Sequence, residues 1–401
     1  MVARPDQIAR RGDVDVLDSA PYWDGAYRWL DERLLRPLLR RIEMWLIPLF
    51  RAAFRRRMNI DVDHERWYPR LASDLMMAVP VARAVRDMQP AFVFGHEVTT
   101  HGLATAFCQG VPRILFPWGA DIYAYAESTP LHWFMTRVAL HGVDLVVPSS
   151  TTAAAHIVKR FGVASKRVVP VSWGVDLEAL GLRSSGRIER IRNELGIPRD
   201  SIVILNSRRF RPVWGCLVAL EAFLAIADEV PGVHFVLFGG DDTGAMMNDA
   251  EREIEERGHR GRFTIFRDEI PLATVREVMV ASDIFVSLLG RGDMRSSSVL
   301  EAAAAGGVPV VADGEEYRLM ERAGFRALFV DGTSSFDVAS ALRSAIGDAG
   351  LRASMRAAND RYVRHHENRA TQMDQMLVEI DQVCQSYGWS LEFERLGARD
   401  D

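Results

Sequence analysis

Residues 290–312 read Gly-Arg-Gly-Asp-Met-Arg-Ser-Ser-Ser-Val-Leu-Glu-Ala-Ala-Ala-Ala-Gly-Gly-Val-Pro-Val-Val-Ala and follow an apolar stretch at 284–288. The stretch and its flanks predict a strand, a charged loop, a helix and a second strand over 308–311. The serines at 296–298 can cap the Ala-rich helix, and the glycine pair at 306–307 ends it. This order of elements is typical of an α/β protein with a parallel sheet.

Two carboxylates lie at the start of this predicted helix. Asp293 stands before the helix, and Glu301 lies inside it, eight positions later. The free amides at a helix N-terminus favour an anion, and Ser296 and Ser297 stand at that terminus. A site that holds a phosphate and also offers carboxylates to hydroxyl groups suits a nucleotide sugar. The alternative is a solvated aspartate and a helix-surface glutamate in an ordinary α/β protein.

This spacing resembles the Glu-x7-Glu signature of the group 1 (family 4) retaining glycosyltransferases, with Asp293 in the place of the first glutamate. The resemblance covers roughly residues 88–366 and rests on the order and spacing of several motifs. It implies the GT-B architecture, in which two Rossmann-like, doubly wound parallel-sheet domains stand in series. In similar proteins the C-terminal helix crosses back to the first domain.

Strands and helices alternate in both halves of the chain. In the second half, apolar strands are predicted at 202–206, 233–238, 263–266, 284–288, 308–311 and 327–330, separated by helices at 216–229, 272–281, 315–323 and 336–346. In the first half, strands are predicted at 91–94, 113–116, 145–148 and 168–171. We therefore expect an acceptor-side domain over 1–172, a nucleotide-sugar-binding domain over 173–375, and a C-terminal helix and tail over 376–401.

The first residues resemble an interior part of such a domain. Residues 7–17 are similar to the end of the family's first helix and its second strand, which would put the opening strand and its glycine-rich loop upstream of Met1. The alternative is that residues 14–17 are the true first strand and 22–25 the loop after it. We favour the late start, although a missing central strand would leave unpaired backbone groups inside a sheet.

Length and composition limit the classes of protein to consider. A chain of 401 residues with 48% hydrophobic and 26% charged residues suits two soluble domains of ordinary size. The formal charge of −5 gives no reason to expect nucleic acid as a partner. Three separated cysteines, Cys108, Cys216 and Cys384, favour a reducing compartment, and neither a spanning segment nor a signal peptide is evident. The expected location is the cytoplasm. Whether the protein also binds the membrane surface depends on one segment.

That question concerns residues 28–57. This segment holds nine arginines against three carboxylates, a net charge of +6, and interleaves them with Leu, Ile, Phe and Trp. A basic amphipathic helix of this kind can lie in an anionic headgroup layer, peripheral on the inner face of the membrane. The alternative is a domain helix that packs its apolar face on the core. Pro37 and Pro48 would break or kink either helix.

In the N-terminal domain, two motifs resemble segments that line the family's cleft. Residues 89–96, Gln-Pro-Ala-Phe-Val-Phe-Gly-His, look like a strand that ends in His96. Residues 116–122, Phe-Pro-Trp-Gly-Ala-Asp-Ile, look like the next strand and its loop, with a tryptophan where the family often has histidine. The resemblance makes His96, His101 and Asp121 candidates for contacting the acceptor or the transferred sugar.

In the second domain, residues 204–215 fall where the family has an arginine and a lysine that grip the donor diphosphate. Arg209 aligns with that arginine, whereas Trp214 replaces the lysine. A planar guanidinium can pair with two phosphate oxygens at once, which suits Arg209 to the role. The lost positive charge could be restored by a neighbouring arginine: Arg208, Arg211, Arg291 or Arg295. Of these, we expect the first two to lie at the surface.

The remaining donor contacts also come from the resemblance. Gly239 and Gly240, after a predicted strand, would let the backbone approach the nucleotide, and Arg267 should flank the base. A glycine pair is a weak signal, because it also marks ordinary turns. The Asp-x-Asp sequences at 61–63 and 13–15 imitate by chance a metal motif of another transferase fold. The histidines and cysteines show no ligand spacing, so we expect no metal and no cofactor.

The resemblance implies an enzyme: a metal-independent glycosyltransferase that moves a sugar from a nucleoside diphosphate donor to an acceptor hydroxyl with retention of configuration. Its expected setting is the synthesis of cell-envelope polysaccharide, lipopolysaccharide or glycolipid, with a sugar or lipid-linked acceptor. Glu301 would bind the ribose hydroxyls and Asp293 a hydroxyl of the donor sugar, while Arg209 and the helix N-terminus would stabilise the departing diphosphate. Two alternatives stay open: a sugar-nucleotide epimerase and a non-catalytic nucleotide-sugar-binding protein.

Overall fold

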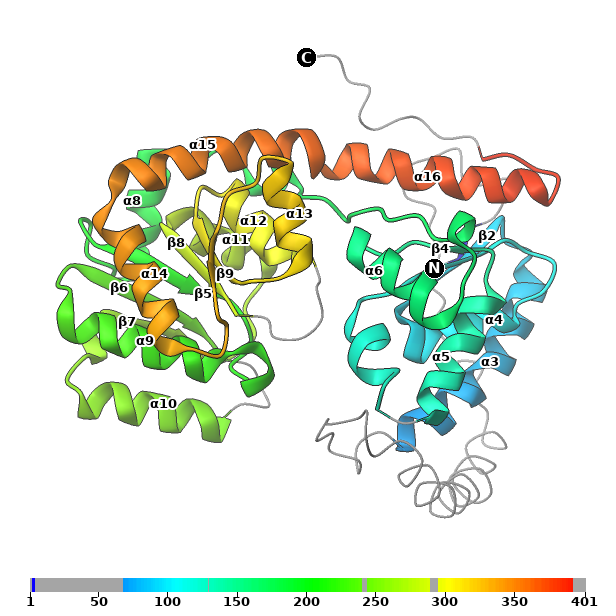
Figure 1. Cartoon of the computed structure of the whole chain (residues 1–401), viewed down its shortest axis with the longest axis horizontal. Coiled ribbons are helices and arrows are strands. Elements are labelled where there is room, and N and C mark those ends of the chain that lie inside the picture. Colours follow the sequence, from blue (N-terminus) through cyan, green and yellow to red (C-terminus); the bar gives the residue numbers. More distant parts are fainter. Residues whose placement is uncertain (1, 4–67, 129, 240–243, 289–294, 392–401) are drawn as a thin grey trace. The chain divides into compact units, whose positions relative to one another are not determined.

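The computed structural model of the chain describes residues 2–3, 68–128, 130–239, 244–288 and 295–391 (Figure 1). Some predictions fall outside these ranges, namely those for 7–25, 28–57, 61–63, Gly240 and Asp293. The chain divides into two compact units, called here the first and the second unit: Met1–Ser172 with Met373–Asp401, and Trp173–Gln372.

The second unit is built on a six-stranded parallel sheet (Figure 1). Its strands are β5 (Ile202–Asn206), β6 (Val233–Phe238), β7 (Phe263–Phe266), β8 (Ile284–Ser287), β9 (Val308–Ala312) and β10 (Leu328–Val330). They lie in the order β10-β9-β8-β5-β6-β7, so the chain runs outward from β5 to β7 and then restarts beside β5 with β8. Such a reversal is the topological switch point of a doubly wound sheet, where ligands bind at the carboxyl ends of the strands. The six strands predicted in this half are confirmed, with shifts of one residue at the ends of β8, β9 and β10.

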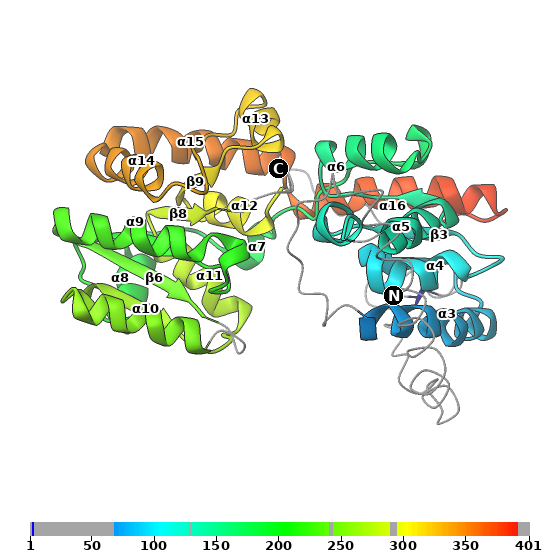
Figure 2. The ribbon, with the colours of Figure 1, turned by 60° about the horizontal axis from the view of Figure 1, so that its bottom comes forward.

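Helices cover both faces of this sheet, because its strands are apolar on both sides. They are α7 (Leu177–Leu180), α8 (Ser185–Glu194), α9 (Cys216–Glu229), α10 (Gly244–Glu256), α11 (Leu272–Ala281), α12 (Ser297–Ala304), α13 (Glu315–Arg322), α14 (Ser335–Gly347) and α15 (Ala349–His366). One core forms under α9, α10 and α14, where the rings of Phe223, Phe235 and Phe263 stack in sequence. A second core forms on the other face, under α8, α11, α12 and α15 (Figure 2). The two cores fix the strand ends from which the functional loops leave.

The first unit has a smaller sheet in the order β1-β2-β3-β4. Its strands are β1 (Val2–Ala3), which is antiparallel to its neighbour, and the parallel strands β2 (Phe92–His96), β3 (Arg113–Phe116) and β4 (Leu145–Val146). The strand predicted over 168–171 is wrong, because Val168 forms only an isolated bridge with Val146. The N–H groups of Val169 and Val171 donate to the carbonyls of Val146 and Pro148 at 3.0 Å, but Pro148 has no N–H to complete the next bridge, which accounts for the short pairing at this edge.

Short π-helical turns follow the strands of the first unit. The helical elements are α3 (Tyr68–Met88), η4 (Glu97–Gly102), α4 (Leu103–Phe107), η5 (Asp121–Tyr125), α5 (Pro130–Gly142), α6 (Thr151–His156), η6 (Ile157–Phe161) and η7 (Ser165–Arg167). Buried Leu115, Val146 and Ile157 belong to the core beneath them. Because η4 begins directly after β2, it holds the carboxyl end of that strand.

The last helix, α16 (Arg369–Ser386), begins in the second unit and from Met373 onward belongs to the first. The chain after it is fixed there by hydrogen bonds: Trp389 Nε1 donates to the carbonyl of Ala91 at 3.2 Å, and the Tyr387 hydroxyl donates to Asp144 at 3.0 Å. The predicted return of the C-terminal helix to the first domain is confirmed. Within the described ranges, no helix is both long and apolar enough to cross a bilayer.

Candidate functional site

Unpaired polar atoms are buried at the carboxyl ends of β5 and β8, the two strands that flank the switch point. Asn206 ends β5 and Ser287 ends β8, and both side chains are almost fully buried. The Asn206 Oδ1 accepts the backbone N–H of Arg208 at 3.0 Å, while its Nδ2 and the Ser287 hydroxyl have no partner among the described residues. Because a buried polar group without a partner costs free energy, these atoms mark a place suited to a polar ligand.

Arg208 lies two residues beyond β5 and extends its guanidinium to the start of α12. Its Nη2 donates to the hydroxyl of Ser296, the residue that precedes this helix. Its Nε is buried without a hydrogen-bond partner, and no described carboxylate forms an ion pair with the guanidinium. Burial lowers the pKa of Arg208, so the cation is held here at a cost in free energy. Arg208 is thus partly buried, whereas the sequence predicted it at the surface.

The serines at the start of α12 do not cap it with their side chains. Ser296 occupies the N-cap position, but its side chain makes no bond to the helix backbone. Its hydroxyl contacts Arg208 instead and lies 3.0 Å from the hydroxyl of Ser298. Ser297 is exposed at the first helical position. The first amides of the helix therefore stand beside a partly buried cation, and both features favour an anion.

Arg209 and Arg267, which the resemblance placed on the donor, already have acidic partners. The side chain of Arg209 is 54% exposed and pairs with Glu269. The Nε of Arg267 donates to Glu251 on α10 at 3.0 Å. Arg208 is therefore the arginine after β5 that the structure turns toward α12, one position before the predicted one.

Gly239 and Arg295 have structural roles. A Cβ on Gly239 would lie 2.7 Å from the carbonyl oxygen of Arg267, so the close approach at this glycine is to the chain after β7. Arg295 pairs with Glu316 at 2.7 Å and with Glu367 at 2.8 Å, and both carboxylates are buried. Arg295 is therefore not available to replace the lysine missing at Trp214.

Glu301 lies on the second turn of α12 and is largely buried. Arg276 of α11 approaches its carboxylate to 3.6 Å, and Arg369 also acts on it electrostatically. Burial raises the pKa of Glu301, and the two arginines oppose that shift. Such a desolvated carboxylate interacts most strongly with hydroxyl and N–H donors. Arg276 was not predicted, because a single arginine in a helix carries no sequence signal of function.

In the first unit, an aromatic row follows the carboxyl ends of β2 and β3. The His96 ring meets Phe94 edge-on at 4.9 Å and Trp118 at 6.5 Å between centroids. Burial lowers the pKa of His96, so its imidazole is neutral at pH 7. His101 bonds through Nδ1 to the carbonyl oxygen of His96 at 2.6 Å. Trp118, which is 56% exposed, gives this row a face on which a sugar ring can stack.

Asp121 is buried and holds the loops after β2 and β3 together. One carboxylate oxygen accepts the backbone N–H groups of Val98 at 2.8 Å and Trp118 at 3.0 Å. The other accepts those of Gly119 at 2.6 Å and Ile122 at 3.0 Å. Burial raises the pKa of Asp121, and these bonds oppose the shift. Backbone amides thus use both oxygens of Asp121, and its contact with a substrate stays a prediction.

Replacing Asp121 by asparagine should destabilise the chain. The new amide NH2 would face backbone donors, and each N–H group left unpaired costs about 1–3 kcal/mol. The midpoint of urea unfolding should therefore fall below that of the wild type. Asp87→Asn, at an exposed position of α3, should leave the midpoint in place. An unchanged midpoint in Asp121→Asn would show that these hydrogen bonds do not hold the loops.

The structure thus brings together only part of the predicted site. Arg208 contacts Asn206 through its backbone and Ser296 through its side chain, Ser287 ends the neighbouring strand β8, and Glu301 lies farther along α12. Asp293, the first carboxylate of the predicted pair, lies outside the described residues. In the part of the chain that the structure describes, no group of His, Cys, Asp and Glu side chains could hold a metal ion.

Known proteins resemble the chain most clearly in its second unit. Residues 187–361 match the family model described as glycosyl transferases group 1. Two D-inositol 3-phosphate glycosyltransferases are similar to the chain: 27% identical over 224 residues in Corynebacterium glutamicum, and 28% over 225 residues in Corynebacterium jeikeium. Each match covers 53% of this chain and 51% of the relative, so the chain spans about half the length of the curated relatives it matches.

Solved structures share the fold over most of the chain. HepE of Anabaena in complex with UDP has a TM-score of 0.64 at 16% identity, covering 76% of this chain and 82% of that one. A glycosyltransferase from Rickettsia africae has a TM-score of 0.63 at 14% identity, covering 81% and 84%. Sucrose-phosphate synthase from Thermosynechococcus elongatus has a TM-score of 0.66 at 14% identity, covering 81% of each chain. The predicted resemblance is confirmed: the chain resembles the group 1 glycosyltransferases, matches their family model at residues 187–361 and has the GT-B fold.

Proposed function

We propose that the chain is a metal-independent, retaining glycosyltransferase that moves a sugar from a nucleoside diphosphate sugar to an acceptor hydroxyl. The observation that carries this proposal is Arg208, a partly buried cation with a buried Nε and no described counter-ion, beside the N-terminus of α12. It stands at the switch point of a doubly wound sheet, where such folds bind nucleotides. A diphosphate supplies the negative charge that balances this cation and the helix amides.

In this proposal Arg208 takes the role predicted for Arg209. Its guanidinium and the helix amides are fixed before the reaction, so they would stabilise the charge that grows on the departing diphosphate without a metal ion. Glu301 would accept hydrogen bonds from the ribose hydroxyls, and Asp293 would hold a hydroxyl of the donor sugar. HepE of Anabaena has been solved in complex with UDP and with UDP-glucose, so uridine donors are the first to test.

The acceptor side of the proposal depends on the first unit. His96 and Trp118 stand at and just beyond the carboxyl ends of β2 and β3, and a ring of the acceptor or of the transferred sugar would stack there. The expected acceptors are the sugars and lipid-linked sugars of cell-envelope polysaccharide, lipopolysaccharide or glycolipid synthesis.

Two measurements on the full chain test this function. Thermal shift with nucleotides and nucleotide sugars should identify a donor, because a ligand of the folded state raises the apparent stability by mass action. Release of the nucleoside diphosphate should then require an acceptor. Release without an acceptor would indicate a sugar-nucleotide epimerase. Donor binding without any release would indicate a non-catalytic binding protein, which the departures at Asp293, Trp214 and Trp118 would explain.

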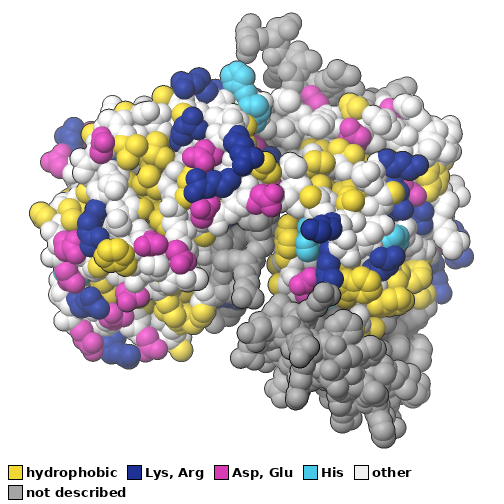
Figure 3. All heavy atoms as spheres, viewed as in Figure 1, with side chains coloured by type: hydrophobic (Ala, Val, Ile, Leu, Met, Phe, Trp, Pro, Cys, Tyr) yellow, Lys and Arg dark blue, Asp and Glu magenta, His cyan; other side chains and the backbone are white. Residues whose placement is uncertain are grey.

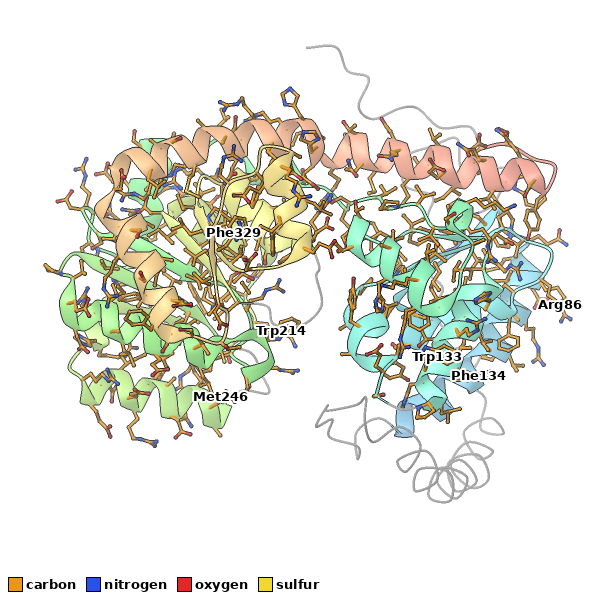
Figure 4. The ribbon with its side chains drawn as sticks, viewed as in Figure 1. Arg86, Trp133, Phe134, Trp214, Met246 and Phe329 are labelled. Carbon is orange, nitrogen blue, oxygen red and sulfur yellow. The ribbon has the colours of Figure 1, made fainter. Side chains whose placement is uncertain are left out.

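A peripheral position on the inner face of the membrane is a second part of the proposal. Three large apolar residues are exposed on neighbouring helices of the first unit: Val79 on α3, Phe107 on α4 and Phe134 on α5. Figure 3 shows hydrophobic side chains gathered over α5 with basic side chains beside them, and Figure 4 labels Phe134 there. Exposed apolar residues flanked by cations suit an anionic headgroup layer, as does the basic segment at 28–57.

Replacing Arg55, Arg56 and Arg57 by serine should release the protein from anionic vesicles. Each arginine near such a surface contributes about 1 kcal/mol, so the partition coefficient should fall by roughly a hundredfold. Sedimentation with phosphatidylserine vesicles measures this, and phosphatidylcholine vesicles provide the neutral control. Arg252→Ser, at an exposed position of α10, should bind as the wild type does. If the wild type never sediments with anionic vesicles, the segment at 28–57 packs as an ordinary part of its domain.

A further inference from the structure

We propose that Trp214 positions Arg208 for the donor diphosphate through a cation–π contact with its guanidinium, so that the site works with one held cation instead of two. The inference rests on the proposed function, because the diphosphate belongs to that function. Trp214 stands where the group 1 family has its second cation, and the structure places it against the first one.

The contact between the two side chains is a cation–π pair. The Cζ of Arg208 lies 5.2 Å from the centre of the Trp214 ring, within the distance at which such pairs are favourable. The ring therefore borders the guanidinium on one side, while the Ser296 hydroxyl accepts a hydrogen bond from Nη2. Two contacts of different kinds restrict a side chain that is otherwise rich in rotamers.

An aromatic partner leaves the N–H donors of an arginine available for a ligand, whereas a carboxylate partner occupies them. Glu269 occupies N–H donors of Arg209, and its negative charge would repel a phosphate. The Trp214 ring stabilises the Arg208 cation without accepting any of its N–H groups and without adding negative charge. The buried Nε of Arg208, which has no partner among the described residues, therefore remains able to meet a phosphate oxygen.

The backbone around Trp214 is also fixed. Trp214 ends a short 3-10 turn, Pro212–Trp214, and its N–H donates to the carbonyl of Arg211 at 3.0 Å. Gly215 follows with a φ of +67°, and a Cβ there would lie 2.7 Å from the Cβ of Leu288. Only glycine fits this turn, which joins Trp214 to the start of α9 (Figure 4). The backbone that carries the Trp214 ring is therefore held in one conformation.

The neighbouring arginines show that this pairing is particular to Arg208. Arg209 and Arg295 each pair with a carboxylate, and Arg276 lies against Glu301. Trp214 therefore has a specific role, because its ring stabilises a desolvated cation before the anionic ligand arrives. A consequence is that the ring supports binding of the diphosphate and contributes nothing to binding of the nucleoside.

Calorimetric titration of the full chain tests this consequence. UDP, GDP and ADP are titrated to find the nucleoside diphosphate that binds. The matching nucleoside is the control ligand, and its weaker binding is measured by ligand-observed NMR. Trp214→Leu should raise the Kd of the diphosphate about tenfold and leave that of the nucleoside within about twofold. Trp214→Phe keeps an aromatic face and should recover most of the loss. Trp214→Lys should bind the diphosphate more weakly than the wild type, because its added charge repels Arg208.

Several outcomes would overturn the proposal. Equal diphosphate binding by Trp214→Leu and the wild type would show that the ring does not act on the ligand. If Trp214→Leu loses the same affinity for the diphosphate and for the nucleoside, Trp214 acts only by packing. Tighter binding of the diphosphate by Trp214→Lys would show that the site needs a second positive charge and not an aromatic contact. Trp214→Met, with a similar reach, replaces the leucine variant if that one does not fold. If the wild type binds no nucleoside diphosphate, the proposed function itself fails, which separates the two failures.

Discussion

Replacing Arg208 by alanine is expected to lower kcat/KM for the nucleoside diphosphate sugar by about a hundredfold or more. Arg208 is the partly buried cation at the N-terminus of α12, so its loss removes charge from the place proposed for the diphosphate. The value of kcat should fall as well as the affinity for the donor, because the charge on the leaving group is greatest in the transition state. Arg208→Lys should also be severe, since an ammonium group reproduces neither the two-oxygen fork nor the guanidinium contact with Trp214.

Arg209→Ala is the matched control for this experiment. Its guanidinium is half exposed and pairs with Glu269, and exposed ion pairs contribute little to stability. The variant should therefore keep kcat and KM close to those of the wild type. Both are measured by varying the donor concentration at saturating acceptor. Circular dichroism first shows that each variant is folded. The reverse pattern, with damage at Arg209 and none at Arg208, would restore the alignment predicted from the sequence. Normal kinetics in both variants would favour the non-catalytic alternative.

The fold of the second unit could be predicted because its signals are local and strong. Each strand is a short apolar run between Gly, Pro or charged residues, and the helices at 216–229 and 272–281 occupy the predicted residues. The first unit was harder, because its strands are short and prolines interrupt the last one. The strand predicted at 168–171 failed for this reason: Pro148 has no N–H to complete the next bridge.

The sequence predicts a phosphate site at the start of α12, but it does not determine which neighbouring side chains face that site. Arg208 and Arg209 are adjacent in a loop, and only the three-dimensional course of that loop decides which one faces α12. Asp121 carries a polar motif that looks functional, but four backbone amides surround its carboxylate. Arg276 comes from a helix that the motif does not include. These placements depend on the direction of each side chain, which a sequence pattern does not report.

Replacing Glu301 by alanine is expected to lower kcat/KM for the donor at least about tenfold, because each hydrogen bond that a ribose hydroxyl donates to its carboxylate contributes about 1.5–3 kcal/mol. The structure adds a complication, since the variant would also leave Arg276 without this partner. Glu301→Gln keeps the volume and one acceptor oxygen while it removes the charge, so its activity should lie between the wild type and the alanine variant.

A double-mutant cycle with the ligand separates loss of the ribose contact from loss of packing. The Kd of the preferred nucleoside diphosphate and of its 2′,3′-dideoxy form is measured for the wild type and for Glu301→Ala. In the wild type, removal of the hydroxyls should weaken binding about tenfold, whereas in Glu301→Ala both ligands should bind equally. Arg276→Ala supplies the control, because it alters the same buried surroundings without removing the acceptor. A tenfold preference for the hydroxylated ligand that persists in Glu301→Ala would assign the ribose to other residues.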